Sequence, residues 1–276
     1  MNTPLITTAA AGQDPAIVWL DCRYNLIDPG AGARAYAEGH VPGAHYAHLE
    51  QDLSGPKHPA GPRVGGRHPL PDRTAFAQRV AAWGITPTSR VVAYDADGGM
   101  YAARAWWLLR WLGHEAVAVL DGGLPAWLAA GGALTTEVPP LREGALPYPA
   151  QPQPAMPTRQ ADALAGYTVV DARAGERYRG ETEPLDSRAG HIPGAVNRFY
   201  KDNLQADSRF KPAAELRAAF AALGEPAKQV HQCGSGVTAC HNLLAMAIAG
   251  LPGAALYPGS WSEWSADPAR PVATGA

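Results

Sequence analysis

The sequence predicts two tandem α/β domains, each with a mainly parallel sheet flanked by helices. Two observations support this fold class. The same motifs occur twice along the chain in the same order, and in each half apolar strand-like runs alternate with helical patterns. A chain of 276 residues is also long enough for one or two domains with cores of their own.

The internal repeat is visible in five pairs of segments. The segments of the first half are residues 17–25, 39–46, 76–83, 90–99 and 120–127, and their counterparts are 168–178, 190–197, 216–223, 228–237 and 257–264. The clearest pairs are "GHVPGAHY" with "GHIPGAVN" and "LDGGLPAW" with "YPGSWSEW". Their constant order over such long separations indicates a duplicated domain rather than a short-period solenoid.

The second half shows the alternation of elements most clearly. We expect strands near 167–172, 194–198, 229–233 and 254–258, and helices near 212–223 and 237–249. Between the halves, residues 139–157 contain seven prolines, which predicts a semi-rigid extended linker. The predicted domains are therefore residues 1–138 and 158–276.

Composition excludes several classes of function. The 23 basic and 25 acidic residues are nearly balanced, which argues against a nucleic-acid-binding surface. No stretch approaches the roughly 20 apolar residues of a membrane span. The start, "MNTPLITTAAAGQDP", lacks the features of a secretory signal, and an odd count of three cysteines suits a reducing compartment. We therefore expect a cytoplasmic protein that binds neither nucleic acid nor membrane.

The segment "HQCGSGVTAC", residues 231–240, is the strongest candidate for a reactive site. Cys233 follows a predicted strand and precedes a predicted helix, at the sheet edge where ligands of open α/β sheets collect. Gly234 and Gly236 allow a turn in which several backbone N–H groups face an anion. That anion is either the thiolate itself or a negatively charged substrate beside it.

A thiolate at this position needs more than one source of stabilisation. Converting an ordinary cysteine largely into thiolate at neutral pH requires about 2.7 kcal/mol, whereas a helix N-terminus supplies about 0.3–1 kcal/mol. The loop N–H groups and the hydroxyl of Ser235 or Thr238 are therefore expected to contribute. We predict that Cys233 is a nucleophile, with a buried structural thiol as the alternative, and that Cys22 and Cys240 lie in the core.

Two other chemistries fit this loop poorly. Cysteine phosphatases carry an arginine six positions after the nucleophile to clamp the phosphate, and here that position is Ala239. His231 and Cys233 also lack a second close pair of ligands, so no metal site is predicted.

Taken together, the two "GH[VI]PGA" blocks, the Asp-x-Arg strand ends, "CGSGVT" and "GSWSEW" resemble the two-domain rhodanese and 3-mercaptopyruvate sulfurtransferase family over about residues 5–272. The resemblance implies two tandem rhodanese-like domains, of which the first is catalytically silent. The internal alignment agrees, because Asp95 stands in the first half where Cys233 stands in the second. A carboxylate cannot attack sulfane sulfur.

The reaction that the resemblance implies moves sulfane sulfur through a persulfide on Cys233. The donor is a small anion, 3-mercaptopyruvate or thiosulfate. The acceptor is thiophilic, namely cyanide or a thiol such as a reduced dithiol protein. Neither a metal nor an organic cofactor is implied. Covalent catalysis in two steps suits an activated cysteine.

The resemblance also assigns roles to individual residues. Arg177 matches the arginine that contacts the donor, and Glu50, His68 and Ser235 match a relay found in mercaptopyruvate enzymes. Arg173 is expected to pair with a nearby carboxylate. The loop residues expected to bind the donor are Gly234, Ser235, Gly236, Val237 and Thr238, and His40 and His191 are expected to be structural.

The loop sequence bears on the choice of donor. Thiosulfate-preferring members carry basic residues directly after the cysteine, whereas this chain has Gly234 and Ser235, as in the mercaptopyruvate type. However, Leu185 stands where that type has a second carboxylate-binding arginine, and Arg188 lies nearby without aligning. A thiosulfate-specific enzyme and a persulfide carrier for one protein partner therefore remain alternatives.

Overall fold

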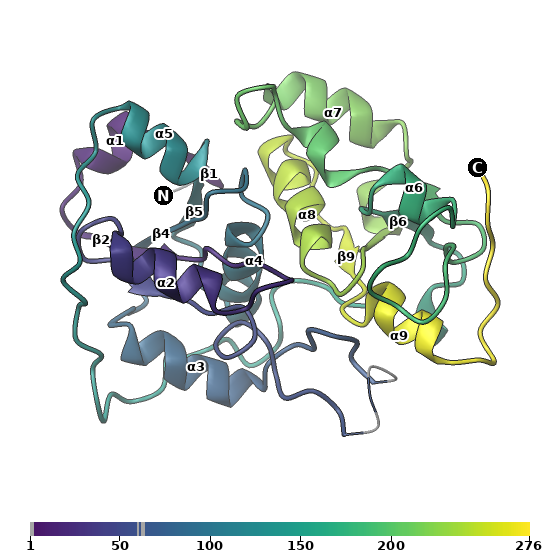
Figure 1. The fold of residues 1–276 in the computed structure, drawn as a ribbon, viewed down its shortest axis with the longest axis horizontal. Helices are drawn as coiled ribbons and strands as arrows, with labels where there is room; N and C mark the ends of the chain where they lie inside the picture. Colours follow the sequence, from purple (N-terminus) through teal and green to yellow (C-terminus); the bar gives the residue numbers. More distant parts are fainter. Residues whose placement is uncertain (1–2, 60, 62–63) are drawn as a thin grey trace. The chain divides into compact units, whose positions relative to one another are not determined.

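In the computed structural model, residues 3–59, 61 and 64–276 are described, and the chain divides into two units (Figure 1). Unit 1 comprises Met1–Ser54, Pro71–Ala155 and Ala206–Phe210, and unit 2 comprises Gly55–Leu70, Met156–Gln205 and Lys211–Ala276. Each unit thus includes a short segment from the other half of the sequence. For unit 2 that segment is 55–70, which contains His68.

Unit 1 is built on a sheet in the order β1-β5-β4-β2-β3, with every pair parallel. Its elements are β1 (Leu5–Ile6), α1 (Thr8–Gly12), β2 (Ile17–Asp21), α2 (Ala31–Glu38), β3 (His45–Tyr46), α3 (Arg73–Ala82), β4 (Arg90–Tyr94), α4 (Ala102–Leu112), β5 (Val117–Leu120) and α5 (Gly123–Ala129). One face of the sheet, with Trp19, Val92 and Tyr94, packs against side chains of α1 and α5.

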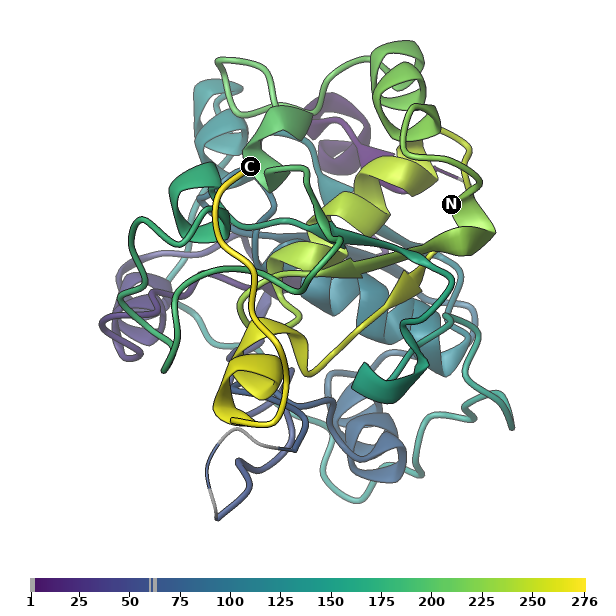
Figure 2. The ribbon, with the colours of Figure 1, turned by 90° about the vertical axis from the view of Figure 1, so that its right-hand side faces the viewer.

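Unit 2 is built on a second parallel sheet in the order β7-β6-β8-β9. Its elements are η1 (Ala161–Ala163), β6 (Thr168–Asp171), α6 (Gly175–Tyr178), β7 (Val196–Asn197), η2 (Tyr200–Asn203), α7 (Ala213–Ala221), η3 (Pro226–Lys228), β8 (Gln229–Gln232), α8 (Thr238–Ile248), β9 (Ala255–Leu256) and α9 (Ser260–Ala266). In Figure 2, α8 (yellow-green) and α9 (yellow) lie on opposite sides of this sheet.

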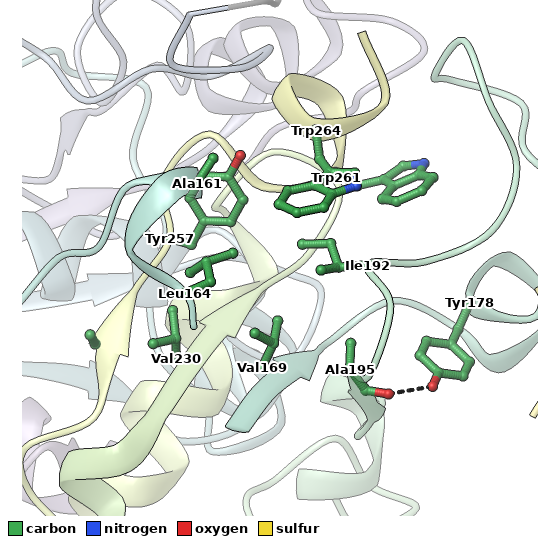
Figure 3. Packing of buried hydrophobic residues seen from close by; sticks show 11 residues of the cluster. Ala161, Leu164, Val169, Tyr178, Ile192, Ala195, Val230, Tyr257, Trp261 and Trp264 are labelled. Carbon is green, nitrogen blue, oxygen red and sulfur yellow. Dashed lines mark hydrogen bonds between the residues drawn. The ribbon is translucent and has the colours of Figure 1, made fainter. Parts of the chain in front are cut away.

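The core beneath α9 holds this helix against the sheet (Figure 3). Val169 and Val230, on neighbouring strands, belong to the same buried cluster as Trp261 and Trp264 of α9, and Trp261 is fully buried. Burying an aromatic or aliphatic side chain of this kind contributes roughly 1.5–3 kcal/mol. α9 comes soon after β9, the edge strand that pairs with β8. The packing of α9 on the sheet therefore holds its first turn beside the end of β8.

The predicted fold class is confirmed. All four strands and both helices expected in the second half are present, although the strands are shorter than their apolar runs. β7 is short because it begins just after the Pro193–Gly194 turn, where Gly194 has a φ of +78° that extended strands do not use.

Residues 139–157 contain neither helix nor strand, as their prolines predict. The segment is nevertheless held in place along unit 1. The backbone N–H groups of Arg142, Tyr148 and Gln151 donate to carbonyls of Ala82, Ala77 and Leu112. None of the helices in the described part of the chain is long and apolar enough to cross a membrane.

Candidate active site

Cys233 lies directly after β8 and before α8, and its side chain is only 2% exposed. The start of α9 holds the backbone at this point. The Cys233 N–H donates to the Ser260 hydroxyl (3.2 Å), and the Cys233 carbonyl accepts from the Trp261 N–H (2.9 Å). The next carbonyl, of Gly234, accepts from the Ser262 N–H (2.9 Å). The loop therefore has a fixed backbone geometry.

Gly236 is required by this geometry for two reasons. Its φ is +75°, a conformation that side chains with a Cβ rarely adopt, and a Cβ at this position would lie 2.5 Å from the Pro258 carbonyl oxygen. Around it, the backbone N–H groups of Ser235, Thr238 and Ala239 donate to no acceptor among the described residues. Such unused donors at a helix start are available to an anion.

The corresponding loop of unit 1 shows how such donors are used. Asp95 follows Tyr94, and Cys233 follows Gln232, at the equivalent register of the two sheets. The fully buried Asp95 carboxylate accepts four backbone N–H groups at 2.8–2.9 Å, from Asp97, Gly99, Tyr101 and Ala102. This loop is therefore an anion nest filled by its own side chain.

The nest in unit 1 is also covered. A Cβ placed on Gly99 would lie 3.5 Å from the ring of Phe210, which is itself buried. The Phe210 N–H donates to the Asp121 carboxylate (3.0 Å). Thus in unit 1 both the loop donors and the space beside the loop are occupied by the chain itself.

His68 and Ser235 lie in direct contact. The His68 Nδ1 is 2.7 Å from the Ser235 Oγ, and both side chains are buried. The segment that carries His68 is fixed on α9. Gly65 N–H donates to the Glu263 carboxylate (2.8 Å), and Arg67 N–H donates to the Ser262 hydroxyl (2.9 Å).

Arg177, at the end of α6, brings a guanidinium group to the same loop. It is paired with Glu183 (2.6 Å) and with Asp186 (3.3 Å). A Cβ placed on Gly234 would lie 3.6 Å from the Arg177 Nη1. Arg177 therefore lies next to the residue that follows Cys233, where a cation for an anionic donor is needed.

Glu50 lies in unit 1, whereas His68 and Ser235 lie in unit 2, so its place in the relay remains a prediction. Within unit 1, Glu50 is near Tyr24. Burial, together with the Glu50 carboxylate, raises the pKa of Tyr24 to about 12. The Glu50 N–H donates to the Nδ1 of His48 (3.1 Å).

The residues expected to be structural are structural. Arg173 binds both carboxylate oxygens of Asp171 and packs over the Trp261 ring. His40 and His191 are buried, and each places its Nδ1 2.8 Å from a backbone carbonyl. Among the described residues, Arg188 donates only to backbone carbonyls, those of Trp264, Ser265, Asp267 and Arg270.

The other two cysteines lie in the core, as predicted. Cys22 and Cys240 are 1% and 0% exposed, and neither forms a disulfide. Burial and the nearby carboxylates, chiefly that of Asp95, raise the pKa of Cys22 well above its ordinary value. Cys22 therefore stays a protonated thiol at neutral pH.

A second buried histidine near the loop, His231, is not protonated at neutral pH. His231, one strand position from the loop, is fully buried, and burial with the nearby Arg198 lowers its pKa to about 3. Its ring is neutral at physiological pH. Asp186 behaves in the opposite way, because burial raises the pKa of its carboxyl while Arg67 opposes the shift. His68, in contrast, is in contact with a loop hydroxyl, that of Ser235.

Sequence reasoning missed Arg67, whose side chain also reaches this loop. Its Nη1 is 2.6 Å from Asp186, and a Cβ placed on Gly234 would lie 3.2 Å from its Nη2. The one feature of the sequence that could have indicated Arg67 is its position directly before His68 in "GRHPLP". Nothing local in that motif shows that the segment packs on unit 2.

Comparison with known proteins identifies the family of the chain. The rhodanese-like domain family matches residues 7–130 and 157–267. The chain is 51% identical to a Pseudomonas aeruginosa protein named "Probable 3-mercaptopyruvate sulfurtransferase", covering 97% of this chain and 95% of that protein. It is 34% identical to the Bos taurus thiosulfate sulfurtransferase, covering 94% of this chain and 89% of the relative.

A solved structure supports the same relationship. The 3-mercaptopyruvate sulfurtransferase from Leishmania major superposes with a TM-score of 0.82 at 30% identity, covering 96% of this chain and 75% of that one. Two matches to one domain family, full-length relatives and a shared fold lead to a single conclusion. The chain belongs to the two-domain rhodanese and 3-mercaptopyruvate sulfurtransferase family.

Proposed function

We propose that this sulfurtransferase takes a sulfur atom onto Cys233, with 3-mercaptopyruvate as its better donor and thiosulfate as a second one, and passes it to a thiophilic acceptor. One observation carries the proposal. Cys233 takes the register position at which Asp95, in the other repeat, is a buried carboxyl group that accepts four backbone N–H groups. A persulfide anion at this position needs the same kind of donors.

The first step forms the persulfide. The Cys233 thiolate attacks the thiol sulfur of 3-mercaptopyruvate, an S–S bond forms, and the bond between that sulfur and carbon 3 breaks. The electron pair of the broken bond goes to carbon 3, which takes up the proton lost by the thiol, so pyruvate leaves. With thiosulfate, the same attack on the outer sulfur releases sulfite and no proton has to move.

Because only the reaction of 3-mercaptopyruvate requires a proton transfer, His68 and Ser235 are assigned to that transfer. The contact of 2.7 Å between Nδ1 and Oγ lets a proton pass between the imidazole and the hydroxyl. Such a pair can take the proton from the thiol and return it to carbon 3. Glu50 is the third member that the family pattern supplies, and Arg177 binds the anionic end of the donor.

The second step returns the cysteine. A thiol or cyanide attacks the outer sulfur of the persulfide, the S–S bond breaks, and the Cys233 thiolate is restored. The loop residues Gly234 to Thr238 stabilise the negative charge in both states through their backbone N–H groups. Covalent catalysis of this type splits one transfer into two displacements.

We expect the variants His68→Gln and Ser235→Ala to separate the two donors. Turnover of 3-mercaptopyruvate should fall by about 10²-fold, because general acid–base catalysis contributes roughly 10²–10⁴. Turnover of thiosulfate should change little, since its transfer moves no proton. Parallel kinetics with both donors and cyanide as acceptor provide the measurement. An equal loss for both donors would argue against the relay.

The same assay tests the proposed function as a whole. Steady-state turnover of the wild-type protein should be fast and multiple with free cyanide, and faster with 3-mercaptopyruvate than with thiosulfate. A preference for thiosulfate would overturn the assignment of the donor. A single slow transfer per chain would instead indicate a persulfide carrier that serves a protein partner.

A further inference from the structure

Two guanidinium groups, not one, converge on Gly234. Arg177 comes from α6 and Arg67 comes from the 64–70 segment that packs on α9. A Cβ placed on Gly234 would lie 3.2 Å from the Arg67 Nη2 and 3.6 Å from the Arg177 Nη1. Because Gly234 follows Cys233 directly, both groups face the loop that holds the sulfur.

The two nitrogens nearest Gly234 have no acceptor among the described residues, and the buried Arg67 Nε has none either. The Asp186 carboxylate accepts hydrogen bonds from the Arg67 Nη1 (2.6 Å) and the Arg177 Nη2 (3.3 Å). The Glu183 carboxylate accepts from the Nη2 and Nε of Arg177. Within the described residues, the Arg67 Nη2 and the Arg177 Nη1 donate to nothing. Neither side chain is fully buried: Arg67 is 20% exposed and Arg177 is 18% exposed.

The carboxylates fix the direction of these free donors. Each guanidinium is planar and rigid, so its orientation is set by the pairing of the Arg67 Nη1 with Asp186 and of the Arg177 Nε and Nη2 with Glu183. The surrounding network is also balanced in charge, with three arginines and three carboxylates, namely Arg67, Arg173 and Arg177 with Asp171, Glu183 and Asp186. An added anion is therefore held by directed hydrogen bonds rather than by an excess of positive charge.

We propose that Arg67 binds the oxyanion end of the sulfur donor together with Arg177, and so replaces the second arginine whose usual position is taken by Leu185. The inference rests on the proposed function, because it assigns a residue to that same site. Arg188, the other arginine near Leu185 in sequence, donates instead to four backbone carbonyls. Arg67 acts as a specificity-determining residue that touches the donor.

The kinetic test compares Arg67→Ala with Arg179→Ala. Arg179 is a matched control, because it is an arginine of the same unit paired with an exposed carboxylate, Glu181, at 2.7 Å. In Arg67→Ala the KM for 3-mercaptopyruvate should rise by about 10- to 100-fold, since the charge-assisted hydrogen bonding of the Arg67 Nη2 to the donor is lost, and kcat should change by less than about threefold. Measuring the KM for thiosulfate in the same variant shows whether Arg67 also binds the SO₃ group of that donor. The control should leave both constants unchanged.

A second readout does not depend on turnover. Iodoacetate carries a carboxylate and iodoacetamide does not, so the ratio of their alkylation rates at Cys233, followed by peptide mass spectrometry, reports anion binding beside the thiol. This ratio should fall by about tenfold in Arg67→Ala. Arg67→Lys should show a smaller loss, because it keeps the charge and loses the planar fork.

The outcomes separate the two proposals. If wild-type protein turns over neither donor but the alkylation ratio falls in Arg67→Ala, the proposed function fails and the role of Arg67 in anion binding stands. If both the ratio and KM are unchanged in folded Arg67→Ala, the inference about Arg67 is overturned while the sulfurtransferase assignment is untouched. Should Arg67→Ala fail to fold, the same two measurements on Arg67→Lys decide the matter.

Discussion

Replacing Cys233 by serine is expected to reduce sulfur transfer by at least about 10⁴-fold, the scale of loss when a covalent nucleophile is removed. The serine hydroxyl is nearly isosteric with the thiol but is not ionised at neutral pH and cannot form a persulfide. The loop should keep its structure, because its contacts to Ser260, Trp261 and Ser262 are made by backbone atoms of Cys233 and Gly234. Kinetics with both donors and thermal unfolding would be measured together.

Cys22→Ala is the matched control for this variant. It removes a buried thiol of unit 1 that burial keeps protonated. Removing the sulfur there leaves a small cavity and costs roughly 1 kcal/mol of stability, without an effect on turnover. Sulfur transfer that survives in Cys233→Ser, or disappears in folded Cys22→Ala, would contradict the assignment of the nucleophile.

Gly236→Ala is expected to have the second largest effect. The new Cβ would lie 2.5 Å from the Pro258 carbonyl oxygen, and the φ of +75° would be strained as well. The loop must then shift, which displaces the N–H donors around the sulfur. We expect activity to fall by about 10²-fold, since small misplacements of reacting groups cost that much, and stability to fall by about 1–3 kcal/mol.

Gly194→Ala separates the two causes. Gly194 has a φ of +78° but open space around it, so the alanine there suffers the backbone strain without a clash. Its activity should remain close to that of the wild type, while its unfolding temperature drops by several degrees. If Gly236→Ala behaves like Gly194→Ala in turnover, the fixed loop geometry is not what activates the cysteine.

Much of the fold could be predicted because the same motifs occur in the same order in both halves of the sequence. The strand that ends at Asp171 and the strand that precedes Cys233 are short, largely buried runs, and glycines follow Cys233 at 234 and 236. Gly236, which has a positive φ, could be predicted as a residue that allows the turn in which several backbone N–H groups face an anion. Local chemistry was sufficient for these features.

What the sequence could not show is where distant segments pack. Residues 55–70 belong to the unit of the second half, and this packing brings His68 to Ser235 and Arg67 to Gly234. The contacts that hold the segment, such as those of Gly65 with Glu263 and of Arg67 with Ser262, join residues almost 200 positions apart. Neither periodicity nor propensity carries information over that distance, which is why Arg67 was missed.

The most direct measurement of the central claim is the mass of the protein after incubation with donor and no acceptor, followed by peptide mapping. The wild-type chain should gain the mass of one sulfur atom, located on the peptide that contains Cys233, and cyanide should remove it. A chain that gains no sulfur from either donor, or gains it at Cys22 or Cys240 instead, would contradict the claim that the β8–α8 loop holds a reactive sulfur anion.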